Sequence, residues 1–339
     1  MIRFNQEYYE KVVNQNGYKF CANLEMPLPG LSVSEMQKWL CVYNLPSNLV
    51  TNLDPKDTLF IAGVGVNREP HIGTISQLLR MLYLQKKGYN VQIILGDLDC
   101  YNARGTDLES IRAIVEKYNA FLDALGFDHN LGVIRNQLDH EEVMKTAFLI
   151  APKISDNDFY DVQEDLYTYY KKKGILTEEI TFPVKQSILM MFADFIHNGF
   201  TSQFKHIIVL SGIDEHTYVP KAAEIARRMN IDMTLSGMFS KLIAGFNNQP
   251  KMSKSLPDSS IWVTMSFSEI LDMLLNHDNG YTDYNDSIVF QLMSSTFIYS
   301  DEELQKMAEH CTENSDEWVK DKIDFSKKLF ELCRIWQNA

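Results

Sequence analysis

The sequence predicts an α/β fold with a doubly wound parallel sheet. Three apolar runs have the length and composition of buried strands, at residues 57–63, 91–96 and 206–212. Each run is followed by a stretch with helical periodicity, at 72–87, 107–125 and 218–229. Strands that alternate with helices pair in parallel, because the helix returns the chain to the same edge of the sheet. The rhythm therefore predicts βαβ units.

The other segments complete this plan. Residues 128–180 are rich in Asp, Lys and Tyr and less regular, and they resemble an insertion between two halves of the sheet. We expect a further helix at 188–195 and a further strand at 231–235. Three regions follow from this pattern: an N-terminal flanking segment of short helices and loops (1–56), a sheet domain (57–265) with an insertion at about 105–205, and a small helical C-terminal domain (266–339).

Composition excludes several classes of protein. The five cysteines are scattered without a paired motif, which indicates reduced thiols and no metal site. The N-terminal residues lack the apolar region of a signal peptide, and no apolar run reaches the length of a membrane span, so we expect a cytoplasmic protein with no membrane partner. The net charge of −13 argues against a generally basic nucleic-acid surface. A local patch such as Lys171–Lys173 could still bind RNA, although such clusters are also common on solvated helices.

The first candidate site lies where the first strand gives way to its helix. The strand ends at Gly63, Gly65 lies in the loop after it, and His71 and Gly73 stand at the start of the helix. Ligands of doubly wound folds bind at the carboxyl ends of strands, where the free N–H groups of a helix start attract anions. Small residues there let a nucleotide approach the backbone, and a histidine can donate to a phosphate oxygen. A glycine-containing turn with a surface histidine would show the same pattern.

The second candidate site is the segment Lys251-Met252-Ser253-Lys254-Ser255, in a loop bounded by two prolines. Two lysines three residues apart, together with two serines, offer ammonium charges and hydroxyl donors to a polyphosphate. Such donors stabilise the leaving pyrophosphate in nucleotidyl transfer, and one of them is typically worth about 2.7–4 kcal/mol of barrier. The pattern predicts an ATP-dependent enzyme.

These two segments resemble the signature motifs of class I aminoacyl-tRNA synthetases, usually written HIGH and KMSKS. The second motif is matched in full, whereas Thr74 stands where the first motif usually has its last histidine. Residues 84–101 and Ser211–Glu215 resemble segments of the tyrosyl and tryptophanyl enzymes, and residues 251–264 look most like tryptophanyl-tRNA synthetases of the archaeal and eukaryotic type. The resemblance covers about residues 57–265. It implies a Rossmann-type catalytic domain, a homodimer whose interface lies in the insertion, and activation of an aromatic amino acid.

The resemblance also implies a role for individual residues. Those expected to bind ATP, with its Mg²⁺, are Gly63, Gly65, His71, Gly73, Thr74, Gly212, Asp214, Lys251, Met252, Ser253 and Lys254. Among them Gly212 and Asp214 would bind the ribose, and Lys251 and Lys254 the pyrophosphate. Those expected to act in catalysis are His71, Thr74, Lys251 and Lys254. Asp97, Gln186 and Glu215 would accept hydrogen bonds from the α-amino group of the amino acid.

The pocket for the amino-acid side chain departs from both specificities. Leu189 occupies the position where tyrosyl enzymes have an aspartate for the phenol, and Phe182 replaces its companion tyrosine. Rejecting an analogue that lacks a hydroxyl requires buried polar partners, so strict tyrosine specificity is not expected. Ile94 stands near the place where a tryptophanyl enzyme would have a glutamine. The pocket therefore suits tryptophan, phenylalanine or a modified aromatic amino acid.

Three functions remain open. In the first, the enzyme activates an aromatic amino acid, tryptophan favoured, to the aminoacyl-adenylate and transfers it to tRNA. In the second, a synthetase paralogue keeps adenylation but serves a biosynthetic pathway or a non-standard acceptor, as Thr74, the altered pocket and the short segment after KMSKS indicate. The third is an inactive regulatory or tRNA-binding relative, against which the presence of His71, Asp214, Lys251 and Lys254 argues.

Overall fold

A computed structural model of the chain describes residues 4–23, 28, 30–162, 165–174, 179–201, 203–278, 283–296 and 299–339. Seven residues of the expected insertion, at 163–164, 175–178 and 202, lie outside this described part. The chain divides into two compact units. The sheet unit comprises Met1–Asn67, Met81–Val115 and Phe127–Lys241, and the helical unit comprises Arg68–Arg80, Glu116–Gly126 and Leu242–Ala339.

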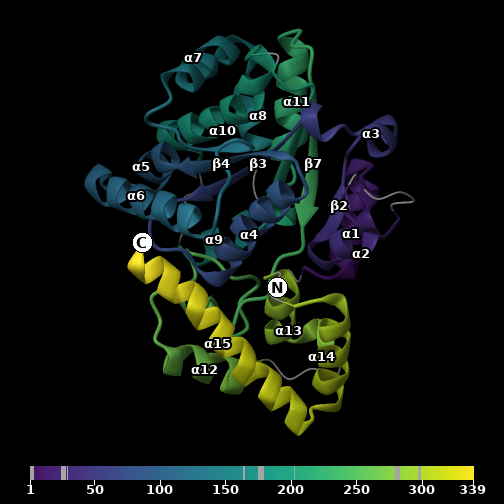
Figure 1. The fold of residues 1–339 in the computed structure, drawn as a ribbon. Helices are drawn as coiled ribbons and strands as arrows, with labels where there is room; N and C mark the ends of the chain where they lie inside the picture. Colours follow the sequence, from purple (N-terminus) through teal and green to yellow (C-terminus); the bar gives the residue numbers. More distant parts are fainter. Residues whose placement is uncertain are drawn as a thin grey trace. The chain divides into compact units, whose positions relative to one another are not determined.

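The sheet unit contains a seven-stranded sheet in the order β1-β2-β7-β6-β3-β4-β5 (Figure 1). Its strands are β1 (Lys19–Phe20), β2 (Leu40–Tyr43), β3 (Thr58–Gly65), β4 (Asn90–Gly96), β5 (Gly132–Asn136), β6 (His206–Gly212) and β7 (Thr234–Ser240). The five strands from β7 to β5 are parallel, and only β1 and β2 run antiparallel to their neighbours. The predicted α/β class with a mostly parallel sheet is confirmed.

Four strands of the sheet differ from the sequence-based expectation. The strand expected at 231–235 begins only at Thr234, because Asn230 takes a left-handed conformation (φ 55°) that ends the preceding helix. β1 and β2 lie in the flanking segment, where only helices and loops were expected. β5 lies in the stretch expected to be irregular, and it approaches β4 so closely that a Cβ on Gly132 would come within 2.3 Å of the Val91 carbonyl oxygen.

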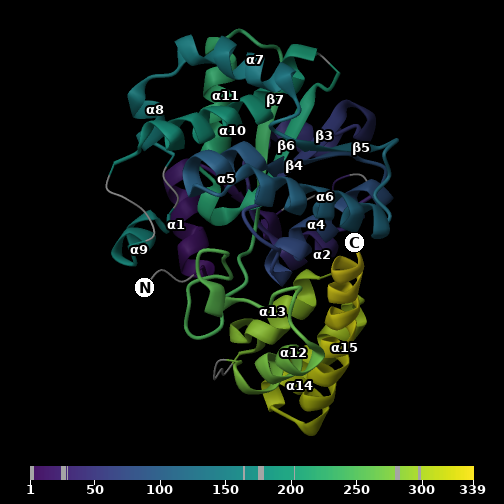
Figure 2. The same ribbon diagram turned by 90° about the vertical axis from the view of Figure 1, so that its left-hand side faces the viewer.

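Helices cover the sheet and fill the connections. Those of the sheet unit are α1 (Gln6–Asn16), α2 (Val33–Trp39), α3 (Ser47–Asn52), α5 (Asp97–Arg104), α7 (Glu141–Ile150), α8 (Asp156–Tyr160), α9 (Tyr167–Lys172), α10 (Phe182–Thr201) and α11 (Tyr218–Arg228). The residues of α4 (Ile72–Lys86) and α6 (Leu108–Ala124) are divided between the two units. The long apolar helix α10 packs against α5, α7 and α11 (Figure 2). Its first turns therefore come close to the polar residues of α5.

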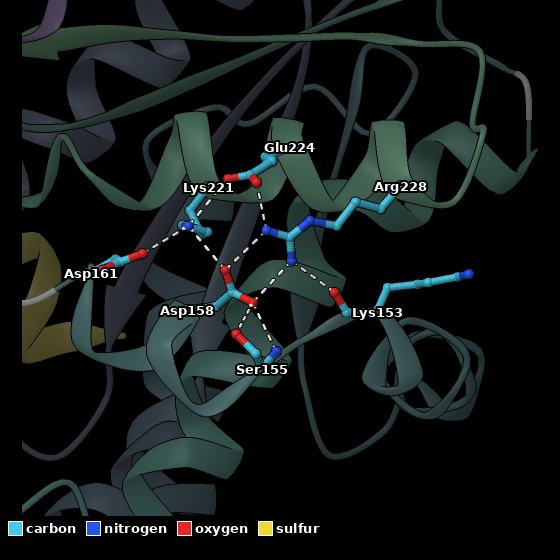
Figure 3. Close-up of polar contacts among 7 residues, drawn as sticks. All are labelled: Lys153, Ser155, Asp158, Asp161, Lys221, Glu224 and Arg228. Carbon is cyan, nitrogen blue, oxygen red and sulfur yellow. Dashed lines mark hydrogen bonds and ion pairs between the residues drawn. The ribbon is translucent and has the colours of Figure 1, made fainter.

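A buried ion cluster ties α8 to α11 (Figure 3). The Asp158 carboxylate, 2% exposed, accepts hydrogen bonds from Arg228 Nη1 at 2.9 Å, Lys221 Nζ at 2.9 Å and the Ser155 hydroxyl at 2.9 Å. Glu224 pairs with both cations from the same helix. These partners, Arg228 first, lower the pKa of Asp158 despite its burial. The cluster fixes the helix that follows the Gly212–Glu215 segment.

The sheet is split where the direction of winding reverses. β3 connects towards β4 and β5, whereas β6 connects towards β7, so the switch lies between β3 and β6. The pairing of β3 with β6 ends at Ile61 and Val209. Beyond that point β3 stays paired with β4 as far as Gly65, and β6 stays paired with β7 as far as Gly212. The carboxyl ends of neighbouring strands thus separate at the switch point, which is where doubly wound sheets bind ligands.

The helical unit is built mainly from the C-terminal helices α12 (Phe267–Asn276), α13 (Ile288–Ser295), α14 (Asp301–Glu313) and α15 (Asp316–Asn338). α15 packs along α12 and α14, and its Trp318, Phe325 and Trp336 are almost completely buried. Each of the four helices begins with a serine whose hydroxyl caps a backbone N–H group. The helical character expected after residue 265 is confirmed for the described residues. None of the helices in the described ranges is long and apolar enough to cross a membrane.

Candidate active site

The two signature motifs are joined by a short backbone ladder within the helical unit. The Ile72 N–H group donates to the Ile261 carbonyl at 2.9 Å, and the Val263 N–H group donates to the Pro70 carbonyl at 3.3 Å. The segment that carries His71 is therefore paired with the segment that directly follows the KMSKS loop. This pairing explains how motifs separated by almost 180 residues of sequence come together.

His71 is buried, and its ring is oriented by its neighbours. The Thr74 N–H group donates to Nδ1 at 3.3 Å, and the Thr74 hydroxyl oxygen lies 3.5 Å from Nε2. Trp262 packs edge-on at 5.7 Å, and a Cβ on Gly73 would lie only 2.9 Å from the imidazole Cε1. Because Nδ1 accepts a hydrogen bond, the proton of a neutral ring belongs on Nε2. Gly73 is the residue that leaves room for this arrangement.

The His71 imidazole is neutral at physiological pH. It is 8% exposed, and burial, followed by the charges of Lys254 and Lys251, lowers its pKa to about 3. A neutral ring can donate a hydrogen bond from Nε2 but cannot supply positive charge. The two lysines therefore supply positive charge here that the His71 ring does not.

The KMSKS loop is held by its own serines. The Ser253 N–H group donates to the Ser259 hydroxyl at 3.0 Å, and the Ser253 hydroxyl accepts from the Ser255 N–H group at 3.2 Å. A tight turn is closed by the Leu256 N–H group, which donates to the Ser253 carbonyl at 3.0 Å. Met252 is buried at 6% exposure. Met252 and Ser253, both predicted ATP-binding residues, thus contribute here to the shape of the loop.

Lys254 is directed towards the first motif. Its Nζ donates to the Arg68 carbonyl at 3.0 Å and to the Tyr118 hydroxyl at 3.1 Å. Its charge, together with that of Lys251, reaches the His71 ring and lowers its pKa. The structure therefore brings His71, Gly73, Thr74 and the KMSKS lysines into one neighbourhood. That arrangement of cations and donors can bind a polyphosphate.

In the sheet unit, the end of β3 presents an open surface. Gly63 is exposed, and a Cβ built on it would meet no atom within 4 Å. A Cβ on Gly65 would make ordinary contacts with Cys100 Sγ at 3.7 Å, and the same sulfur accepts from the Val66 N–H group at 3.1 Å. Nothing in the described protein thus requires glycine at position 63. The space beside it can accommodate a ligand.

The Gly212–Glu215 segment lies at the end of β6 and is held in place by Asp165. Asp214 is 2% exposed, and its carbonyl accepts from the Asp165 N–H group at 3.2 Å. The Asp165 carboxylate accepts from the Tyr8 hydroxyl and lies 3.6 Å from His216 Nε2. Burial would raise the pKa of Asp165, but its hydrogen bonds with His216 and Tyr8 lower it, so this anchor is ionised. Glu215 is half-buried beside it.

The Asp97 carboxylate is engaged in the fold. It accepts hydrogen bonds from the backbone N–H groups of Leu98 and Gln137 at 2.8 Å and of Leu138 at 3.1 Å, and from the Asn136 side chain at 2.9 Å. A carboxylate has about four acceptor positions, so these bonds nearly saturate it. Asp97 thereby joins the end of β4 to the turn after β5.

Asp99, two residues further along α5, was not singled out in the sequence. Burial raises its pKa, against the smaller lowering effects of Arg104 and the Ser187 hydroxyl. Ser187 follows Gln186, whose side chain is exposed on α10. The structure thus brings a partly buried carboxylate to the first turns of α10, where Gln186 also lies. The repeated acid in Asp97-Leu98-Asp99 at the end of a strand was the available sequence signal.

Known proteins resemble this chain in sequence and in fold. The family model for class I tRNA synthetases (W and Y) matches residues 64–330. The tryptophan--tRNA ligase of Aeropyrum pernix is 24% identical over 212 residues, which are 57% of this chain and 50% of the relative. Tryptophan--tRNA ligase 1 of Halobacterium salinarum is 24% identical over 168 residues, 50% of this chain and 30% of the relative. The matched part is thus half or less of the length of these relatives.

Solved structures support the fold. The crystal structure of tryptophanyl-tRNA synthetase from Aeropyrum pernix superimposes with a TM-score of 0.79 at 17% identity, covering 98% of this chain and 93% of that one. Members of the matched family bind ATP, an aromatic amino acid and tRNA. With its parallel sheet split at the switch point and its KMSKS loop paired to the His71 segment, the chain belongs to the tryptophanyl and tyrosyl family of class I tRNA synthetases.

Proposed function

We propose that the chain activates an aromatic amino acid, tryptophan favoured, with ATP and transfers it to tRNA. The observation that carries the proposal is the pairing of the His71 segment with the KMSKS loop, which sets a neutral donor beside two ammonium groups. This arrangement fits the polyphosphate of ATP better than it fits a monoanionic ligand.

The reaction follows from charge and position. The carboxylate of the amino acid attacks the α-phosphorus of ATP, the bond to the β-phosphate oxygen breaks, and pyrophosphate leaves. Lys251 and Lys254 stabilise the charge that develops on the leaving group, and His71 donates from Nε2 to a phosphate oxygen. No protein nucleophile takes part. Binding energy and orientation supply the rest of the acceleration.

Magnesium would enter with ATP. Mg²⁺ keeps several of its waters and binds mainly through substrate phosphates, where it neutralises charge. No group of three or more His, Cys, Asp or Glu side chains that could hold a metal ion occurs among the residues the structure describes. A metal carried by the phosphates fits this chain, because it does not depend on a cage of protein carboxylates.

For the α-ammonium group we propose Asp99 together with Gln186 and Glu215. Asp97, predicted for this role, already accepts four hydrogen bonds, whereas Asp99 is partly buried and has a raised pKa that an ammonium ligand would lower. Asp99→Asn should therefore raise the KM for the amino acid, and Asp97→Asn should chiefly lower stability. Steady-state kinetics and thermal melting of both variants distinguish the two roles.

A buried amide supports a substrate with an aromatic heterocycle. Gln92 is 4% exposed, and its side-chain nitrogen has no hydrogen-bond partner among the described residues. Side chains alternate along a strand, so Gln92 lies on the same face of β4 as Ile94. Ile94 is paired with Gly63, the open position of β3. We propose that this face lines the side-chain pocket and that Gln92 is its polar group; Gln92→Leu should then weaken discrimination between tryptophan and phenylalanine.

The alternative is a paralogue that adenylates an amino acid for another acceptor. It is favoured by Thr74, which stands where the first motif usually has its last histidine, and by the altered pocket for the amino-acid side chain. ATP–pyrophosphate exchange should be measured with each of the common amino acids and then followed by charging of tRNA. Exchange with tryptophan and charging of tRNA support the proposal, and exchange without charging supports the paralogue. Absence of exchange with every amino acid would refute adenylation of the common amino acids.

We further propose a homodimer through residues 105–205, to be checked by light scattering.

A further inference from the structure

The Lys254 ammonium rests on a buried tyrosine that the sequence did not single out. Tyr118 has no exposed surface, yet its hydroxyl lies 3.1 Å from Lys254 Nζ, which also stands 5.5 Å from the centre of its ring. The second acceptor of this ammonium is the Arg68 carbonyl at 3.0 Å. Both of these acceptors are neutral groups, and they hold the ammonium in one orientation. A lysine has a long stem with four rotatable bonds, and such contacts reduce the entropy lost when it binds a phosphate.

The last turn of α15 fixes this tyrosine. The indole of Trp336 packs edge-on against the Tyr118 ring at 4.9 Å and against Phe121 at 5.4 Å. Gln337, the next residue, donates from Nε2 to the Val263 carbonyl at 2.9 Å. Val263 belongs to the ladder that joins the two signature motifs. One helical turn therefore supports both the tyrosine behind Lys254 and the segment that pairs with the His71 segment.

We propose that Tyr118 is a positioning residue for Lys254, held in place by the last turn of α15. The expected effect of Tyr118 on the rate rests on the proposed function, whereas its expected effect on the Lys254 amine does not. Tyr118 orients the ammonium towards the leaving pyrophosphate and does not touch the reacting atoms. The hydrogen bond from Lys254 Nζ to the carbonyl of Arg68, three residues before His71, places the oriented charge beside the first motif.

Tyr118→Phe is the direct test, because it removes the hydroxyl and keeps the ring for Trp336. Tyr299→Phe is a matched control from the same unit. Tyr299 is 5% exposed, and the ammonium of Lys328 lies 4.0 Å from the centre of its ring. The substitution removes its hydrogen bond to Asp324, which lies outside the two motifs. A hydrogen bond to a charged group is typically worth enough for a rate change of about tenfold or more. We expect kcat for pyrophosphate exchange to fall about tenfold in Tyr118→Phe, with an unchanged KM for the amino acid, and to stay at the wild-type value in Tyr299→Phe.

A second measurement does not depend on activity. Pulse acetylation followed by peptide mass spectrometry reports how readily the Lys254 amine reacts. Release from the Tyr118 hydroxyl should increase this reactivity severalfold in Tyr118→Phe and not in Tyr299→Phe. Rates are normalised to the adenylate burst, so that unfolded protein does not count as a lower kcat.

The outcomes separate the inference from the proposed function. Faster acetylation together with a lower kcat supports the inference, and the Tyr118→Phe change should then have no further effect in a Lys254→Ala background. Unchanged acetylation overturns it, whatever the rates are. Faster acetylation with an unchanged kcat also overturns it, because the tyrosine would then hold the lysine without serving the reaction. If the wild type shows no exchange with any amino acid, the proposed adenylation fails, and acetylation alone decides whether Tyr118 positions Lys254.

Discussion

The charge state of His71 gives a prediction whose size can be worked from the structure. Its pKa is lowered from the ordinary 6.5 to about 3 by burial and by the charges of Lys254 and Lys251. As pH falls below 6.5, the unfolded chain binds a proton that the folded chain refuses, so stability is lost from pH 6.5 downwards until pH 3. A pH of 4.5 lies two units below the ordinary pKa of 6.5. The stability lost at that pH is therefore about 2.7 kcal/mol, at 1.36 kcal/mol per unit.

The perturbation is His71→Gln, which retains a neutral donor near the position of Nε2 and does not titrate. Urea unfolding of both proteins at pH 7 and pH 4.5 gives a double difference in which the lost packing cancels. We expect the wild type to lose about 3 kcal/mol more than the variant on acidification. The ratio of the two kcat values for pyrophosphate exchange should stay constant from pH 5.5 to 8.5. An inflection of that ratio near pH 6.5 would show that His71 acts as an imidazolium, and the reasoning would be wrong.

Three further predictions concern single positions. Gly73→Ala would place a Cβ 2.9 Å from the His71 Cε1 and should cost about 1–3 kcal/mol of stability by overpacking, with a raised KM for ATP, measured by urea unfolding and by exchange at varied ATP. Lys254→Ala should lower kcat for exchange roughly 100- to 1000-fold, the loss expected for one preorganised donor, and an unchanged turnover would remove this lysine from the mechanism. Asp158→Ala leaves Arg228 and Lys221 without their buried partner and should cost about 3–5 kcal/mol in urea unfolding, while the rate per folded molecule stays unchanged.

The central strands could be predicted from the sequence because they are buried on both faces. Parallel strands covered by helices are continuous apolar runs, as in β3, β4 and β6. β5 has no such run, since it carries Arg135 and ends at Asn136. Arg135 is compatible with burial only because Asp194 of α10 pairs with it at 2.8 Å. That partner lies 59 residues away in the sequence, so no local pattern around Arg135 predicts the ion pair.

Part of the candidate site could likewise be singled out from the sequence. His71, Gly73 and the two KMSKS lysines follow from residue chemistry, and the resemblance added the roles of Gly212 and Asp214. The sequence could not decide between two acidic residues of one short segment. Asp97 and Asp99 differ in their hydrogen bonding, because the N–H groups of Gln137 and Leu138 donate to the first of them. Tyr118 was missed for the same reason, because its relation to Lys254 exists only in the folded chain.

The substitution at Thr74 acquires a meaning from the geometry around His71. Two histidines in the first motif would offer two donors near the phosphates. Here the backbone N–H of Thr74 fixes Nδ1 of His71 as an acceptor, and its hydroxyl lies near Nε2, so the motif holds one neutral donor in one orientation. Burial first, and then the charges of the two lysines, keep that ring neutral, so His71 adds no positive charge to that of the lysines. Catalysis should therefore depend more steeply on the placement of Lys251 and Lys254 than in an enzyme with two histidines, which is why a hydroxyl behind Lys254 can matter for the rate.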